Sequence, residues 1–287
     1  MRERVRALWI AAASAPLLAG CLATPTPLAP AVSGSVGVPH YGVQTGAVEL
    51  PRRGDGFERF RQHSPNYWGN ARLVRLIEEA AAAVEREMPG PPLRVGDLSA
   101  RHGGKIPGHN SHRTGRDVDL LWYVTTPAGV PVKNPGFIRV GSDALSLVTP
   151  DYGYLRIDVP RQWLLFRHLL TSEHAKVQWL FVSREVEALI TDYARARGEP
   201  LDLIWSAENV MLQPGDSAPH DDHVHVRITC TQAEAVAGCE GGGPHWPWLP
   251  EWPALAPLGH DVLAEIAADD PFEIVGGATA GVGAGGV

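Results

Sequence analysis

The stretch HDDHVHVRI, residues 220–228, ends in an alternation of polar and apolar residues that predicts a half-buried strand. Successive side chains of a strand point to opposite faces. The polar face carries His223, His225 and Arg227, and the apolar face carries Val224, Val226 and Ile228. Because an apolar face has to pack on a core, this strand belongs to a sheet whose other face holds titratable groups.

A second stretch, DVDLLWYV at 117–124, predicts a strand with the same alternation. Asp117 and Asp119 share one face, opposite Val118 and Leu120. If the two strands are neighbours in one sheet, Asp119 and His225 can lie side by side.

Elements around these two strands indicate the fold class. A helix is predicted over 71–88, because its apolar residues fall on one face and PGPP follows at 89–92. The apolar residues of that face are Leu73, Leu76, Ile77, Ala80 and Val84. Further strands are predicted at 92–100 and 177–183, and further helices at 162–172 and 184–197. This order has no regular βαβ rhythm and predicts an α+β fold with a central, mainly antiparallel sheet and flanking helices.

The N-terminal residues 1–20 predict an export signal, with a basic start followed by a short apolar stretch. LAGC at 18–21 resembles a bacterial lipoprotein signal, which implies lipidation of Cys21; the alternative is a plain secretory signal. Leu22 instead of an aspartate after the cysteine favours the outer membrane, so we expect a periplasmic, lipid-anchored protein.

Composition divides the mature chain into three parts. We predict a flexible tether over 21–50, a globular domain over 51–240 and an irregular tail over 241–287, rich in Pro, Trp and Gly. The tail's tryptophans, Trp246, Trp248 and Trp252, could stack on sugars, but we favour packing along the domain.

Charge and cysteines narrow the class of protein. The 287 residues carry a formal net charge of −7 and no dense run of Lys or Arg, which argues against a nucleic-acid partner. In an oxidising compartment the pair Cys230 and Cys239 predicts one disulfide; two free buried thiols are the alternative.

Six of the twelve histidines fall into two windows, one around GHNSHRTGRDVDL and one in the opening stretch. His112 precedes Asp119 by seven residues, and Gly115 between them permits the loop to fold back. With His225 this gives two imidazole nitrogens and one carboxylate oxygen. Zn²⁺ prefers such a set, with a fourth position for water, so we expect one ion in the domain.

The pair GHNSHRTGRDVDL and HDDHVHVR resembles the penicillin-insensitive murein endopeptidases, over about residues 55 to 240. These enzymes belong to the group of lysostaphin-type peptidases, D-Ala-D-Ala metallopeptidases and the hedgehog signalling domain, which implies a hedgehog-like zinc peptidase fold. The resemblance gives the zinc ligands as His112, Asp119 and His225. It also implies a peptidoglycan substrate.

Two further histidines match family positions beside the metal, which implies catalytic roles for His220 and His223. We favour His223 as the general base and His220 as the partner of the oxyanion, although the two roles could be exchanged. Asp222 is an alternative base, because related branches place a catalytic glutamate three residues before this ligand. Strand parity, however, points Asp222 away from His225.

A second metal ion is a further alternative. His109 matches a family position near the metal and could join a second ion or orient a ligand. Asp151 is the nearest equivalent of the acid such a site would need, but no histidine follows it in DYGYLRID.

The leading hypothesis is a zinc-dependent hydrolase that cleaves the D-alanyl-meso-diaminopimelyl cross-link. A zinc D,D- or L,D-carboxypeptidase of stem peptides is the first alternative, and it would need a cationic residue such as Arg101, Arg113, Arg116 or Arg227. A non-catalytic wall-binding lipoprotein on the same fold is the second alternative. The complete set of histidines argues against that binder.

Overall fold

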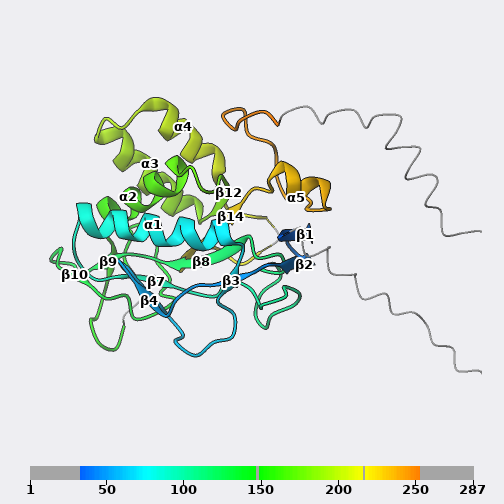
Figure 1. Cartoon of the computed structure of the whole chain (residues 1–287). Coiled ribbons are helices and arrows are strands. Elements are labelled where there is room, and N and C mark those ends of the chain that lie inside the picture. Colours follow the sequence, from blue (N-terminus) through cyan, green and yellow to red (C-terminus); the bar gives the residue numbers. More distant parts are fainter. Residues whose placement is uncertain (1–32, 147–148, 216, 253–287) are drawn as a thin grey trace, which may run out of the picture. The chain divides into compact units, whose positions relative to one another are not determined.

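A computed structural model describes residues 33–146, 149–215 and 217–252. A mixed sheet of seven strands is the largest element of the domain (Figure 1). From edge to edge its strands are β13 (Met211–Leu212), β12 (Val177–Phe181), β14 (His223–Ile228), β8 (Asp117–Leu121), β7 (Leu93–Val95), β5 (Phe57–Arg59) and β4 (Arg53–Gly54). Only the pairs β12–β13 and β5–β7 are parallel. The α+β class and the mainly antiparallel sheet are therefore confirmed.

Helices α1 to α4 gather on one side of this sheet in Figure 1. They are α1 (Ala71–Glu87), α2 (Val159–Thr171), α3 (Arg184–Ala196) and α4 (Leu201–Val210). The five residues predicted for the apolar face of α1 are all buried. Alternate residues of the central strands, including Val118, Leu120, Val224 and Val226, belong to the same core. The opposite face of β8 and β14 is thus left for polar side chains.

Three smaller sheets and one short helix complete the described elements. They are the hairpin β1 (Gly34–Val38) with β2 (Tyr41–Thr45), the pair β3 (Val48–Glu49) with β6 (Trp68–Gly69), the three strands β10 (Pro131–Val132), β9 (Val124–Thr125) and β11 (Arg156–Ile157), and α5 (Gln232–Val236). None of the helices described is long and apolar enough to cross a bilayer.

The prediction of a tether over 21–50 is wrong for its second half, because β1, β2 and β3 lie there. Ser35 is fully buried, and its Oγ donates a hydrogen bond to the carbonyl of Thr114, 2.6 Å away. The frequent Gly and Pro residues of this segment indicated a linker, although its valines alternate over short stretches as in strands. The folded domain therefore begins near residue 34; residues 1–32, including Cys21, lie outside the described residues.

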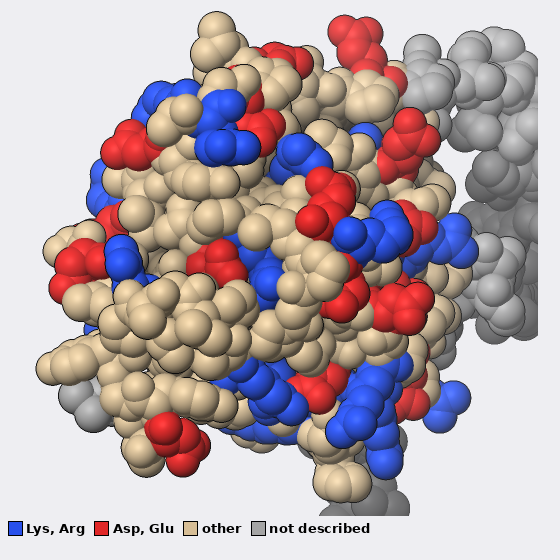
Figure 2. All heavy atoms as spheres, turned by 90° about the vertical axis from the view of Figure 1, so that its left-hand side faces the viewer, with Lys and Arg blue, Asp and Glu red and all other residues tan. Residues whose placement is uncertain are grey.

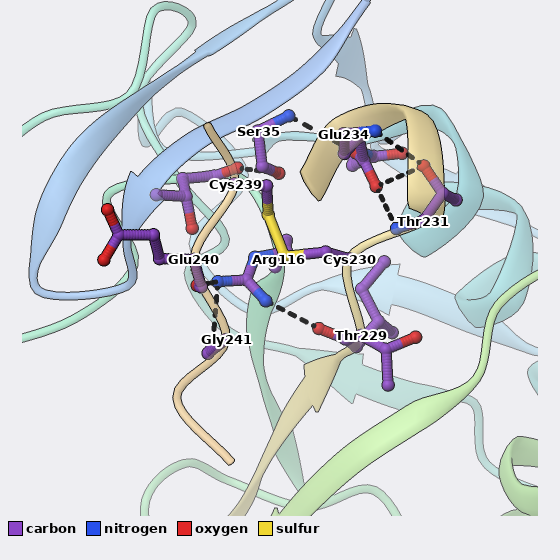
Figure 3. The surroundings of a disulfide bond; sticks show 12 residues. Ser35, Arg116, Thr229, Cys230, Thr231, Glu234, Cys239, Glu240 and Gly241 are labelled. Carbon is purple, nitrogen blue, oxygen red and sulfur yellow. Dashed lines mark hydrogen bonds between the residues drawn. A yellow bond between two sulfur atoms is a disulfide. The ribbon is translucent and has the colours of Figure 1, made fainter. Parts of the chain in front are cut away.

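The predicted disulfide between Cys230 and Cys239 is present (Figure 3). It brackets α5, whose buried Glu234 accepts hydrogen bonds from the backbone of Ser35 and Thr231. Fully buried Arg116 points at the same loop and donates to the carbonyls of Glu240 and Gly241. The N-terminal hairpin and the end of β14 are thus joined around one cross-link.

The described part of the tail, residues 241–252, contains no helix or strand. Trp246 is buried, and its indole N–H donates to the carbonyl of Gln178 at 2.9 Å. Its ring stacks on that of Trp248, with centroids 5.0 Å apart. Packing along the domain is therefore confirmed for Trp246, whereas Trp252 is 48% exposed. The rest of the tail, residues 253–287, lies outside the described residues.

Figure 2 shows basic and acidic side chains mixed on the face that it draws, with several basic side chains grouped in its lower part. Charges of both signs are thus present on this one face of the molecule.

Candidate metal centre

Strand pairing brings the predicted metal ligands together. Strands β8 and β14 are antiparallel neighbours, with His225 directly opposite Asp119 and Arg227 opposite Asp117. The predicted side-by-side placement of Asp119 and His225 is confirmed. All four residues lie on the face of the sheet that points away from the hydrophobic core, as the alternation of polar and apolar residues predicted.

Three imidazole nitrogens converge on one oxygen of Asp119. Oδ1 lies 3.2 Å from Nε2 of His112, 3.3 Å from Nε2 of His223 and 3.6 Å from Nδ1 of His225. Burial opposes the charge of Asp119, but the adjacent His112 and His223 outweigh it and hold the pKa well below its usual range. The carboxylate of Asp119 is therefore ionised at neutral pH.

A folded-back loop positions His112. Gly115, which was expected to permit the loop to fold back, has φ of +71°, in the left-handed region that glycine adopts readily. His112 itself has φ of +63°, which is uncommon for a non-glycine residue and occurs mostly at sites that are held by their surroundings. Its Nδ1 lies 2.6 Å from the carbonyl of Leu98, which can only accept, so the ring donates there and Nε2 faces Asp119.

Asp117 orients His225 in the same manner. Nε2 of His225 lies 2.7 Å from Oδ1 of Asp117, and Nε of Arg227 donates to that oxygen at 2.6 Å. Full burial would raise the pKa of Asp117, but Arg227 and His225 hold it far below its usual value. Burial and the nearby His112 lower the pKa of His225 to about 4. The ring is thus neutral at pH 7, with Nδ1 turned toward Asp119.

Nε2 of His112 and Oδ1 of Asp119 are buried and have no hydrogen bond of acceptable geometry within the described structure. Orphaned buried polar atoms are rare in folded proteins, and a cation between them would satisfy both. With Nδ1 of His225 they form a donor set of two imidazoles and one carboxylate. These residues therefore fit a divalent cation such as Zn²⁺.

His220 and His223 lie beside this set, and their ligand atoms and that of His225 are within 4.8 Å of one another. Nδ1 of His223 is 2.5 Å from Oδ1 of Asp222. Burial lowers the pKa of His223, but Asp119 and Asp222 outweigh burial and raise it to about 10. Burial and the charge of His223 lower the pKa of His220, whose Nδ1 is buried without a partner in the described structure.

His109 also reaches the centre, whereas Asp151 does not. Nδ1 of His109 lies 3.7 Å from Oδ2 of Asp119, and its Nε2 lies 3.3 Å from Oδ2 of Asp97. Among the described residues, two groups of side chains could hold a metal ion: His220 with His223 and His225, and His109 with His112 and Asp119. Asp151 is exposed on a turn before β11 and belongs to neither group. The acid that accompanies His109 is Asp97.

A family model described as penicillin-insensitive murein endopeptidase matches residues 35–245. This range is most of the chain and contains every residue of the centre. The chain belongs to the penicillin-insensitive murein endopeptidase family. The match begins at β1, which agrees with the early start of the folded domain.

Relatives with this name occur in several bacteria. The protein of Haemophilus influenzae is 26% identical over 219 residues, which are 71% of this chain and 69% of the relative. The protein of Klebsiella pneumoniae subsp. pneumoniae is 28% identical, covering 68% and 66%. The protein of Salmonella paratyphi C is 33% identical, covering 70% and 68%. The chain thus spans about two thirds of the length of these family members.

Sequence reasoning missed three contributors to this family member's site. Asp97 and the orienting role of Asp117 were not predicted, although Asp117 shares the face of Asp119 in the alternation. Asp97 follows Gly96 after β7 and is buried; the signal in the sequence was an acid inside the strand predicted at 92–100. Phe137, whose ring centroid is 5.3 Å from that of His223, comes from a loop that no periodicity marks.

Proposed function

We propose that this protein is a zinc-dependent peptidoglycan hydrolase that cleaves the peptide cross-link between D-alanine and meso-diaminopimelate. One observation supports a metal most strongly: Nε2 of His112 and Nδ1 of His225 converge on Oδ1 of Asp119. Of these atoms, Nε2 of His112 and Oδ1 of Asp119 are buried without a hydrogen bond in the described structure. Family membership supports the substrate, because the relatives are named murein endopeptidases.

His112, Asp119 and His225 would hold the ion. When bound there, zinc polarises the scissile carbonyl and lowers the pKa of a water molecule toward neutrality. The carbonyl of Leu98 and the carboxylate of Asp117 fix the two imidazole rings, so the donor set needs little rearrangement. We propose one ion, with His109 held beside it by Asp97.

His223 would accept the proton of the attacking water. The carboxylate of Asp119 contributes to its raised pKa, and a divalent cation on that carboxylate weakens the attraction. The pKa of His223 then moves down toward the range where a general base works at neutral pH. The hydrogen bond from Nδ1 to Asp222 turns Nε2 toward Asp119, which favours Asp222 as an orienting group over Asp222 as the base.

His220 would stabilise the oxyanion that develops on the scissile carbonyl. Its ring centroid lies 5.4 Å from that of His223 and 5.9 Å from that of His225. Its buried Nδ1 lacks a partner in the described structure, so a donor to substrate is available without breaking an internal hydrogen bond.

The mature protein would work in the periplasm from the outer membrane, attached through a lipid on Cys21. LAGC at 18–21 supports this proposal, together with a wall substrate that lies next to that membrane.

Metal removal tests the mechanism. Exhaustive chelation should abolish release of monomers from cross-linked peptidoglycan dimers, and Zn²⁺ should restore it; mass spectrometry of the digest measures both. The same assay on monomeric pentapeptides separates the candidates. Conversion of monomers alone would identify a carboxypeptidase, and turnover that survives complete removal of metal would contradict the zinc mechanism.

Two single substitutions distinguish metal binding from proton transfer. His225→Ala should lose the metal, measured by elemental analysis, because it removes a ligand nitrogen. His223→Ala should retain the metal and lose turnover by about 10²- to 10⁴-fold, the usual contribution of a general base. Equal metal loss in both variants would show that His223 is a ligand.

A further inference from the structure

We infer that Arg61 determines substrate specificity by binding a carboxylate on the leaving side of the scissile amide. This inference rests on the proposed function, because it assigns a partner to one group of the proposed substrate. Arg61 follows β5, and its side chain is 59% exposed, so the guanidinium can meet a substrate from solvent.

One set of contacts links Arg61 to the metal centre through Asp97. Nη1 of Arg61 lies 3.2 Å from Oδ2 of Asp97, and the same oxygen is 3.3 Å from Nε2 of His109. The other nitrogen of His109 is 3.7 Å from Asp119. Arg61 is therefore separated from Asp119 by two side chains on this side.

A second set of contacts links Arg61 to the metal centre through Phe137. The guanidinium carbon of Arg61 lies 5.9 Å from the ring centroid of Phe137, and that ring packs edge-on against His223 with centroids 5.3 Å apart. The guanidinium also lies 5.8 Å from the ring centroid of Phe60. Because both routes end at histidines that contact Asp119, Arg61 stands at the exposed border of the centre.

Donors of Arg61 remain available for a ligand. A guanidinium has five N–H donors, and in the described structure Arg61 uses Nη1 for Asp97. Three other arginines on or beside these strands are occupied. Arg227 is buried against Asp117, Arg139 holds both oxygens of Asp221, and Arg116 is fully buried on backbone carbonyls.

The proposed substrate supplies the matching group. In a cross-link through the amino group of an α-amino acid, the carbon bearing the scissile nitrogen also bears a carboxylate. Asp97 and Asp222 lie beside the proposed ligands and would repel that carboxylate, so a cation next to it would favour its approach. Arginine pairs with carboxylates through two parallel hydrogen bonds, and Arg61 is the exposed cation joined to the centre by both sets of contacts.

Two substrates and four proteins test the inference. The substrates are cross-linked muropeptide dimers in which the diaminopimelate carboxylate next to the cross-link is free or amidated. The proteins are the metal-loaded wild type, Arg61→Gln, Arg61→Lys and the control Arg195→Gln. Arg195 on α3 is matched to Arg61, because it is 53% exposed and its Nη1 is also 3.2 Å from an aspartate, Asp192. Metal content is measured for each protein.

The wild type should prefer the free carboxylate, and Arg61→Gln should lose about ten- to hundredfold in kcat/KM on that dimer alone, mainly through KM. Arg61→Lys should be intermediate, and Arg195→Gln should match the wild type. An equal loss on both dimers, or a preference that survives in Arg61→Gln, would overturn the inference.

Calorimetric binding of the product peptides, with free or amidated carboxylate, separates this inference from the proposed function. If the wild type cleaves neither dimer, the endopeptidase function fails. Tighter binding of the free carboxylate that disappears in Arg61→Gln would still support Arg61 as the anchor. Equal binding of both peptides by the wild type would overturn it.

Discussion

Asp117 decides which nitrogen of His225 faces the metal centre. Its carboxylate can only accept, so Nε2 carries the proton and Nδ1 is left for a ligand bond. The ion pair with Arg227 keeps Asp117 ionised in spite of full burial. The contacts of Arg227 with Asp117 and of Asp117 with His225 therefore fix both the tautomer and the direction of one proposed ligand.

Asp117→Asn should weaken zinc binding by about ten- to hundredfold, the usual effect of removing a group that orients a ligand. Competition with a chromophoric chelator measures this affinity. Asp222→Asn is the matched control, because Asp222 orients His223, which is not a proposed ligand, and its zinc affinity should stay at the wild-type value. Unchanged affinity in Asp117→Asn, with near-UV circular dichroism that verifies the fold, would contradict the orienting role.

The sequence predicted the face of the sheet on which the site residues lie. Side chains alternate along a strand, and the apolar residues Val224 and Val118 assign the other face to His225 and Asp119, which the pairing of β14 with β8 places opposite each other. Asp97 and Phe137 were missed because they reach the site from other segments, brought there by tertiary packing. Periodicity within one segment carries no information about such contacts.

The β1–β2 hairpin joins the loop closed by the disulfide Cys230–Cys239 to the loop that carries His109 and His112. Gly37 exchanges backbone hydrogen bonds with Gly238 and Glu240, next to Cys239. At its other edge the hairpin bonds the loop that carries His109 and His112, through Gln44 N to the carbonyl of His102 and from Arg113 N to the carbonyl of Pro39. A segment whose composition predicted a tether thus supports the loop of the candidate metal centre.

Composition misled here for a physical reason. Gly and Pro lower strand propensity. Gly37 and Gly42, however, lie where strands β1 and β2 come so close that a side chain would meet backbone atoms. The residues typical of a linker are therefore the ones that this tight hairpin requires.

The double variant Cys230→Ser/Cys239→Ser should lower the free energy of unfolding by about 2 to 3 kcal/mol, as expected for a short closed loop. Urea unfolding measures the loss. Hydrogen exchange at the amides of Gln44 and Arg113 should also accelerate, because the hairpin loses its fixed neighbour. Reducing agent is the control: it should shift the wild type equally and leave the variant unchanged. A variant as stable as the oxidised wild type would contradict this role.

The early start of the fold limits how far a lipid anchor would let the enzyme reach. If Cys21 carries lipid, about a dozen residues separate it from β1. Even fully extended, such a segment spans no more than about 45 Å. An anchored enzyme would then act only on the wall layer nearest its membrane.

Cys21→Ala should release the protein from the membrane fraction and abolish incorporation of labelled fatty acid, because the lipid acceptor is gone. Fractionation of cells and labelling measure both, with Leu22→Ala as a control that keeps the acceptor. Cleavage of isolated peptidoglycan by the purified variant should equal that of the wild type, since every proposed site residue lies within the match at 35–245. A Cys21→Ala protein that stays in the membrane fraction would show that another feature of the chain holds it there.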